Sequence, residues 1–327
     1  TVLAFPDEIP YSAEGTADTE YYTVTKIRLP AFGGIPSDND FKSVHFPNGV
    51  EEISLRNGAS KLSQVEELTI PGSVTDFNGQ LQDMKALKTL TFEKGVEEIS
   101  GDSVVRGCSS LTTIHLPRSL KKLSGTATFG DATALTTITL PEEIEITGIS
   151  TFSGCTDLKE IELPASITKI NDYMFKDCTS LQKVAAKGTI TEIGNSAFNS
   201  DANLVEIPDL SHVTTIGWSA FEDCTSLQSV DLHNVTSLGV NAFSGCSALS
   251  GEIDLSGLDA IPNYAFTYDK NITSIKFRDT LKSIGKWAFI WAAAEKVKLP
   301  DTVESIGEYA FYYSDLKGTL KLPDSLT

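Results

Sequence analysis

The chain has 327 residues, of which 40% are hydrophobic, so it is long enough for two globular domains and apolar enough to build a core. Its formal net charge of −18 opposes binding to the phosphates of nucleic acids and to anionic lipid surfaces. No run of residues approaches the length of about 18 apolar residues that a membrane-spanning helix needs. The composition therefore excludes nucleic acid as an expected partner, and it excludes direct insertion into a membrane.

Residues 1–23 fit no repeating pattern, and we expect them to form an N-terminal cap or a linker. The chain begins at Thr1 rather than at a methionine, so we also expect that an upstream segment was removed. The lack of a signal segment therefore does not indicate the cytoplasm.

A repeat begins near Val24 and continues to the end of the chain, so residues 24–327 are predicted to form about 13 to 14 coils, the last one incomplete. The copies before Leu111 are degenerate, whereas the later copies align on a phenylalanine every 22 or 23 residues. This phenylalanine recurs at Phe129, Phe152, Phe175, Phe198, Phe221, Phe243, Phe266, Phe289 and Phe311.

The unit from Leu158 to Ser180 shows the pattern clearly, as L-x-x-I-x-L-P-x-S-I-x-x-I-x-x-x-x-F-x-x-C. The I-x-L alternation predicts a short strand with one buried side, and the proline after it ends the strand. The spacing of Ile216, Ala220 and Phe221 suits a short helical turn. We therefore predict a β-rich α/β solenoid of the leucine-rich-repeat type, with coils of about 23 residues, a parallel concave sheet, and short helical turns or loops on the convex side.

The five cysteines occupy one position of the repeat. Cys155, Cys178, Cys224 and Cys246 each follow the repeat phenylalanine by three residues, and Cys108 holds the same place after Val105. Other coils put alanine, serine or aspartate there, which indicates a slot for a small side chain. We therefore expect buried, reduced thiols rather than disulfides.

The stretches I-x-L-P-x-S-I-T-x-I, I-G-x-x-A-F and F-x-G-C-x-x-L resemble the BspA-like leucine-rich-repeat family of bacterial surface proteins. The last of these stretches occurs at Phe152–Leu158 and at Phe243–Leu249. The resemblance extends from near Val24 to the end of the chain. It implies a secreted or surface-anchored protein that attaches to host matrix proteins or to other cells, and it implies no catalytic residues.

The outward-facing strand positions divide into blocks along the sequence. The first block carries mostly hydroxyl groups, at Thr69, Thr89, Thr91, Thr113, Thr137 and Thr139. The second block is acidic, at Glu160, Glu162, Glu206, Asp231, Glu252 and Asp254, and it is interrupted by Lys183 and Ala185. The third block is basic, at Lys276, Lys296, Lys298 and Lys321. These residues either solvate the strands or form a graded binding surface along the concave face.

Aromatic residues form a second candidate surface, on the convex side opposite the sheet. Three pairs with i, i+4 spacing occur in consecutive coils, at Tyr264 and Tyr268, Trp287 and Trp291, and Tyr309 and Tyr313. On a helical turn each pair shares one face. The rings either pack against one another or remain exposed and bind a sugar or a protein.

The sequence contains no motif for nucleophilic catalysis, phosphate binding or metal binding. His212 and His233 fall in neighbouring coils at nearly the same register, but a metal site needs further ligands. We expect no enzyme activity, no cofactor and no metal. The predicted function is a monomeric extracellular scaffold that binds a macromolecule, expected to be a protein of the host matrix or cell surface. The alternative is a glycan-binding module that uses the aromatic rows.

Overall fold

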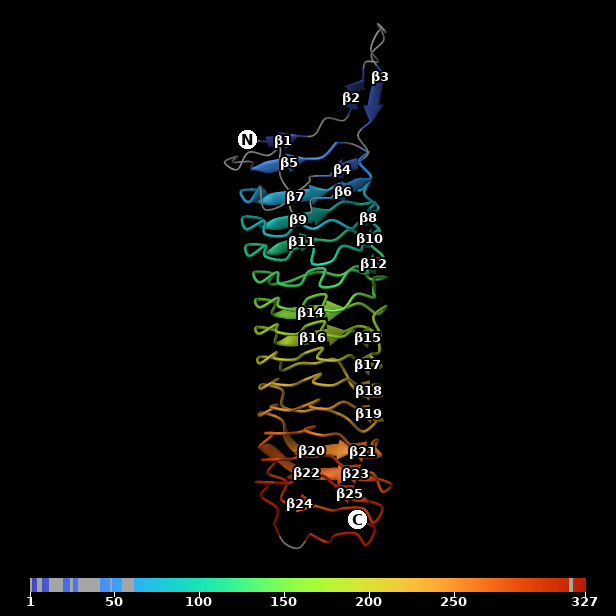
Figure 1. The fold of residues 1–327 in the computed structure, drawn as a ribbon, viewed down its shortest axis with the longest axis vertical. Helices are drawn as coiled ribbons and strands as arrows, with labels where there is room; N and C mark the ends of the chain where they lie inside the picture. The colour runs from blue at the N-terminus through green and yellow to red at the C-terminus, as the bar shows by residue number, and fades with distance from the viewer. Residues whose placement is uncertain are drawn as a thin grey trace. The chain divides into compact units, whose positions relative to one another are not determined.

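The structure of the chain is a computed structural model, and it describes residues 2–4, 8–11, 20–23, 26–28, 42–47, 49–54, 62–317 and 320–327. The chain divides into two compact units, Thr1–Thr156 and Asp157–Thr327. Both units consist of stacked coils with parallel sheets (Figure 1). The described residues form about 11 coils. The sequence predicts 13 to 14 coils, and much of the weakest repeat region, before residue 62, lies outside the described residues.

In the first unit, two parallel sheets follow two sides of the coils. One sheet contains β7 (Glu67–Ile70), β9 (Thr89–Phe92) and β11 (Thr113–His115). The other contains β8 (Asp76–Phe77), β10 (Glu98–Ile99), β12 (Lys122–Leu123) and β13 (Glu145–Ile146).

Before residue 62 the described strands pair in twos. The parallel pairs are β1 (Val2–Ala4) with β5 (Ser43–His45) and β4 (Lys26–Arg28) with β6 (Glu52–Ser54). The antiparallel pair is β2 (Glu8–Tyr11) with β3 (Glu20–Thr23). Part of the predicted cap, residues 1–23, therefore pairs with later strands, and its role as a cap remains a prediction.

The second unit repeats this arrangement. Its I-x-L strands form two groups, which are β14 (Glu160–Leu163) with β16 (Lys183–Ala186), and β20 (Ser250–Leu255), β22 (Asn271–Phe277) and β24 (Lys296–Val297). The shorter strands form two further groups, which are β15 (Lys169–Ile170), β17 (Glu192–Ile193), β18 (Thr215–Ile216) and β19 (Ser237–Leu238), and β21 (Ala260–Ile261), β23 (Ser283–Ile284) and β25 (Ser305–Ile306). We call the side that carries the I-x-L strands the strand face.

The repeat phenylalanines fill the interior of the coils, as predicted. Phe129 and Phe152 in the first unit are fully buried, as are Phe175 and its counterparts as far as Phe289 in the second. From Phe175 to Phe311 successive rings stack with centroids 5.1 to 5.5 Å apart. Each coil therefore buries its apolar side against its neighbours, which is how a solenoid without a globular core is stabilised.

The prediction of short helical turns is wrong, since the described residues contain strands and turns but no α-helix. Each turn from Ser103 onward instead places two residues, four apart, in the left-handed region. The φ angles are 60° at Tyr264 and 70° at Tyr268, and 61° at Trp287 and 66° at Trp291. Alternate amides of the turn bond to the next coil, as Phe266 N–H does to the Ala288 carbonyl at 2.8 Å, and amides between them bond three residues back, as Thr267 N–H does to the Tyr264 carbonyl at 3.4 Å. Those amides are unavailable for a helical i to i−4 ladder.

All five cysteines are free and buried, as predicted for a small-residue slot. The Sγ atoms of Cys108, Cys155, Cys224 and Cys246 lie 3.1 to 3.3 Å from a backbone carbonyl oxygen of the preceding coil. Burial raises the pKa of the Cys108 and Cys155 thiols to about 12. These thiols are therefore protonated packing groups rather than nucleophiles.

Candidate binding surfaces

The alternating strands place the predicted acidic block on the strand face. Glu160, Glu162, Glu206, Asp231 and Glu252 are exposed, and Asp254 is half-buried beside them. Of the predicted basic block, Lys276 and Lys298 are exposed. Lys296 belongs to β24, but its side chain lies outside the described part of the structure.

Lysines from adjacent coils pair with this acidic block. Lys183 Nζ lies 2.6 Å from the Glu206 carboxylate, and Lys187 Nζ lies 2.8 Å from that of Glu162. The hydrogen bond to Glu206 raises the pKa of Lys183, because it stabilises the charged ammonium. Much of the acidic charge predicted from the sequence is therefore matched between coils, and it does not form a uniformly negative surface.

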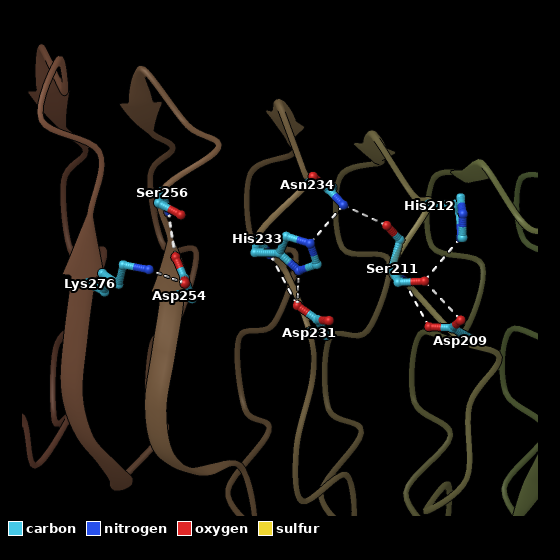
Figure 2. A network of polar contacts seen from close by, with 9 residues as sticks. All are labelled: Asp209, Ser211, His212, Asp231, His233, Asn234, Asp254, Ser256 and Lys276. Carbon is cyan, nitrogen blue, oxygen red and sulfur yellow. Dashed lines mark hydrogen bonds and ion pairs between the residues drawn. The ribbon is translucent and has the colours of Figure 1, made fainter.

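Three aspartates at one register position, Asp209, Asp231 and Asp254, form polar contacts on the strand face (Figure 2), and Asp254 belongs to β20. Their carboxylates accept hydrogen bonds from backbone amides two residues later, and the pairs are Asp209 with Ser211 at 2.9 Å, Asp231 with His233 at 3.3 Å, and Asp254 with Ser256 at 2.9 Å. Other coils have proline at the position of Ser211, His233 and Ser256, for example Pro164 and Pro300. Proline has no N–H group, so the aspartate satisfies a donor that those coils lack.

Asp254 also binds the following coil, since its carboxylate lies 2.7 Å from Lys276 Nζ. Partial burial alone raises the pKa of Asp254, but the hydrogen bonds from Lys276 and Ser256 outweigh that effect and lower the pKa overall. The predicted acidic and basic blocks therefore meet here as an ion pair. Asp209 belongs to the same row, because it precedes the buried Leu210 as Asp231 precedes the buried Leu232. The sequence analysis missed it because counting from the repeat leucine, Leu204, assigns Asp209 to an inward position.

The two histidines are held within their own coils (Figure 2). His233 Nδ1 lies 2.5 Å from Asp231, and His212 Nδ1 lies 3.0 Å from the Ser211 hydroxyl. That hydroxyl donates to Asp209 at 2.8 Å, so the serine is not arranged as a nucleophile that gives its proton to histidine. In the described part of the chain, no cluster of three or more histidine, cysteine or acidic side chains is arranged to hold a metal ion.

The predicted aromatic pairs lie together in the second unit, and they form a surface that we call the aromatic patch. Trp291 stacks on Tyr313 with centroids 4.3 Å apart, and Trp287 contacts Tyr309 edge to face at 5.2 Å. The patch includes a residue that the sequence analysis missed, Tyr312, whose ring centroid is 4.1 Å from that of Tyr313. Its members are Tyr264, Tyr268, Trp287, Trp291, Tyr309, Tyr312 and Tyr313.

The patch is exposed in spite of these ring contacts. The exposed fractions are 50% at Tyr268, 39% at Trp291 and 58% at Tyr313. Lys270 Nζ lies 5.4 Å from the centre of the Trp291 ring, within reach of a cation–π interaction. The rings therefore pack against one another and remain open to solvent, which combines the two alternatives left by the sequence.

These coils and surfaces define a repeat-built scaffold. The model of the BspA type leucine rich repeat region matches residues 20–131, 125–250 and 259–327, in six copies. The chain therefore belongs to the BspA-type leucine-rich-repeat family, as its sequence motifs predict. That family consists of repeat scaffolds. No curated protein matches the chain closely enough to count as a relative.

One solved structure shows the same fold, and a second is less similar to this chain. A leucine-rich repeat protein from Bacteroides ovatus is 24% identical with a TM-score of 0.67, over 100% of this chain and 82% of the other. A leucine rich cell surface protein from Faecalibacterium prausnitzii is 22% identical with a TM-score of 0.46, over 84% of this chain and 87% of the other. Among the residues that the structure describes, no helix is both long and apolar enough to cross a membrane.

Proposed function

We propose that this chain is an extracellular binding scaffold that recognises a protein partner on a host or cell surface through its repeat surface. The observation that carries the proposal is the aromatic patch. Exposed tyrosine and tryptophan side chains are the residues most enriched at the centres of protein interfaces. The strand face is a weaker candidate, because three of the six carboxylates in the acidic block, those of Glu162, Glu206 and Asp254, are already paired with lysines.

The backbone of the patch supports a binding role. Tyr264, Tyr268, Trp287, Trp291, Tyr309 and Tyr313 all have left-handed φ angles between 56° and 70°. The equivalent positions in other coils hold residues such as Ser196 and Gly245. Bulky residues in this conformation cost about 1–2 kcal/mol each. A surface that keeps strained, exposed aromatic rings is more readily explained by contact with a partner than by stability.

Charged groups border the patch. Lys286 forms an ion pair with Glu308 at 2.8 Å, next in sequence to Trp287 and Tyr309. A rim of charge around an aromatic centre is the usual anatomy of a protein interface. The surface fits a protein partner whose own contact residues are apolar or aromatic.

A glycan is the second candidate ligand. Trp291 and Tyr313 stack on each other at 4.3 Å and are both exposed, so their rings are available for carbohydrate stacking. The surrounding charges are less suited to a neutral sugar, which makes protein the first choice.

The test compares Trp291→Ala and Tyr313→Ala with a control, Trp218→Ala. The control removes an exposed tryptophan from an equivalent turn that lies earlier in the chain and outside the aromatic patch. Immobilised extracellular-matrix proteins and a glycan array serve as probes. We expect the two patch variants to lose at least about tenfold in affinity for a matrix protein, as hot-spot residues do, and Trp218→Ala to bind like the parent. Binding to glycans alone would favour the second candidate. Equal binding by all the variants would rule out the patch.

A further inference from the structure

The strand-face sheet of the first unit stops at β11. The next coil carries the same sequence pattern, with Leu135, Ile138 and Leu140 in the places of Leu111, Ile114 and Leu116. Yet residues 136–140 form no strand, and Figure 1 shows no arrow on the strand face of this coil. In the described structure no backbone hydrogen bond joins residues 112–116 to residues 136–140.

Among the described residues, the two coils lack backbone hydrogen bonds to each other only along this face. On the second side β12 pairs with β13, with Lys122 opposite Glu145. On the turn side the Phe129 N–H donates to the Thr151 carbonyl at 2.9 Å. Hydrogen bonds on the other two sides thus hold the two coils next to each other. The gap on the strand face therefore exists within a folded pair of coils.

Backbone groups are left without partners on both sides of the opening. The Thr113 amide bonds to the Lys88 carbonyl on the β9 side at 3.1 Å. Because alternate residues of a ladder point to opposite edges, the amide and carbonyl of Ile114 point into the opening. Across it, residues 136–140 form no backbone hydrogen bond within the described structure.

A cleft of about 820 Å³ occupies this place. Ile114, Ile138 and Leu140 form apolar parts of its lining, and hydroxyl and imidazole groups from Thr113, Thr137, Thr139 and His115 complete the adjacent walls. Arg118, Glu142 and Glu143 place charges of both signs at one end. The volume falls within the range of about 300–1,000 Å³ that is typical of ligand sites.

We propose that this cleft binds an extended polypeptide segment of another protein, which enters as an additional β-strand between the two coils. Each edge is five residues long, or about 16 Å at strand spacing, which accommodates about five residues of a ligand. Main-chain pairing with both edges supplies the affinity. The apolar lining on one side and water on the other require apolar and polar side chains to alternate in the ligand. The site is independent of the aromatic patch, which belongs to the other unit.

A display library of random heptapeptides, selected on the whole chain, tests the proposal. We expect the enriched peptides to alternate apolar and polar residues. A synthetic copy should slow hydrogen exchange at Ile114 and at residues 137–140. The same peptide N-methylated at two central amides keeps its side chains but loses backbone donors, and it should bind at least about tenfold more weakly.

Two variants complete the experiment. Thr137→Pro removes an unpaired amide from the cleft and should weaken binding of the selected peptide, whereas Trp291→Ala in the aromatic patch should leave it unchanged. If Thr137→Pro fails to fold, the N-methylated peptide tests the same contact on the parent chain. The proposal is overturned if no peptide is enriched, if N-methylation leaves the affinity unchanged, or if oligosaccharides rather than peptides protect these amides.

Discussion

The residue three places after the inward phenylalanine lies in a buried slot of the coil, and its type determines whether the coil contains a buried titratable carboxyl group. Most coils fill this buried slot with cysteine, alanine or serine, but two fill it with Asp201 and Asp269. Burial raises the pKa of both carboxyl groups well above the usual value, since it penalises the charged form. The Cys178 amide donates to Asp201 at 2.8 Å, which offsets only part of this effect.

These carboxyls make the stability of the second unit depend on pH. An unfolded aspartate releases its proton near pH 3.9, whereas the buried ones keep it to a higher pH. Above the unfolded pKa the unfolded chain binds fewer protons, so stability falls as pH rises until the folded pKa is reached. The free energy of unfolding of Asp201→Ser, relative to that of the parent, should therefore be greater at pH 7 than at pH 4. The difference should grow by up to about 1.4 kcal/mol per pH unit between the unfolded and the folded pKa.

The measurement is the free energy of unfolding by denaturant at several pH values. Asp157→Ser, which alters an exposed aspartate in the same unit, serves as the control and should preserve the pH dependence of the parent. A variant at Asp201 that kept the full dependence would show that its carboxyl is ionised in the folded state.

At the scale of the elements, two alternative devices end the strand-face segments of the coils, whether or not the segment forms a strand. Proline closes coils such as those of Pro117 and Pro164, and an aspartate closes the coils of Ser211, His233 and Ser256 through their backbone amides. Both devices leave no unsatisfied donor where the segment ends. Part of the acidic character of this region therefore has a structural explanation that is independent of any ligand.

Whether proline can replace the aspartate that accepts a hydrogen bond from the backbone amide can be tested at Asp209. Asp209→Ala should lower the denaturation midpoint, because it leaves the Ser211 amide without its acceptor. In a Ser211→Pro background there is no amide to satisfy, so adding Asp209→Ala should cost much less. A double-mutant cycle measures the difference. Equal losses in both backgrounds would mean that the aspartate acts through something other than the amide.

The sequence patterns predicted the inward phenylalanines and the burial alternation of the I-x-L segments correctly, because alternation and period depend directly on burial. Some of these segments, such as Ile138–Leu140, nevertheless form no strand. They failed at the turns. Tyr264 and Tyr268 are four residues apart, which matches one helical turn, but the same spacing separates the two left-handed residues of each coil. Aromatic residues rarely adopt positive φ, so propensity gave no indication of this conformation. The packing of neighbouring coils imposes it.

At the scale of the whole molecule, each coil depends chiefly on its immediate neighbours. In the second unit the Phe221 ring stacks between Phe198 and Phe243 at 5.1 Å on each side. Phe221→Ala should cost about 3–5 kcal/mol, and the loss should be centred on the coils that contact it. Phe311 stacks on the Phe289 ring at 5.5 Å and is half-buried, so Phe311→Ala should cost less.

Hydrogen exchange would locate the damage caused by Phe221→Ala, and denaturant unfolding would measure its size. We expect faster exchange between residues 198 and 243, with little change in the coils of the first unit. Uniform acceleration along the chain would contradict the local dependence of one coil on the next.

The surfaces were less predictable than the coils for a reason that also belongs to this scale. Ion pairs such as Lys183 with Glu206 join residues 23 positions apart, and Lys276 with Asp254 joins residues 22 positions apart. The order of the outward residues in the sequence shows the sign of each charge, but it does not show which residues form ion pairs across neighbouring coils. Likewise the gap beside β11 leaves no trace in the pattern, because Leu111 and Leu135 begin units with the same apolar spacing.

The slot cysteines also provide a set of internal reporters. Cys108 and Cys155 lie in the first unit, and Cys178, Cys224 and Cys246 lie in the second, each closed inside its own coil. A thiol-specific label can reach one of these sulfur atoms only when that coil opens. The rate of labelling at each cysteine therefore reports how often its coil opens by local unfolding. The local stability of the native protein can thus be mapped without any engineered probe.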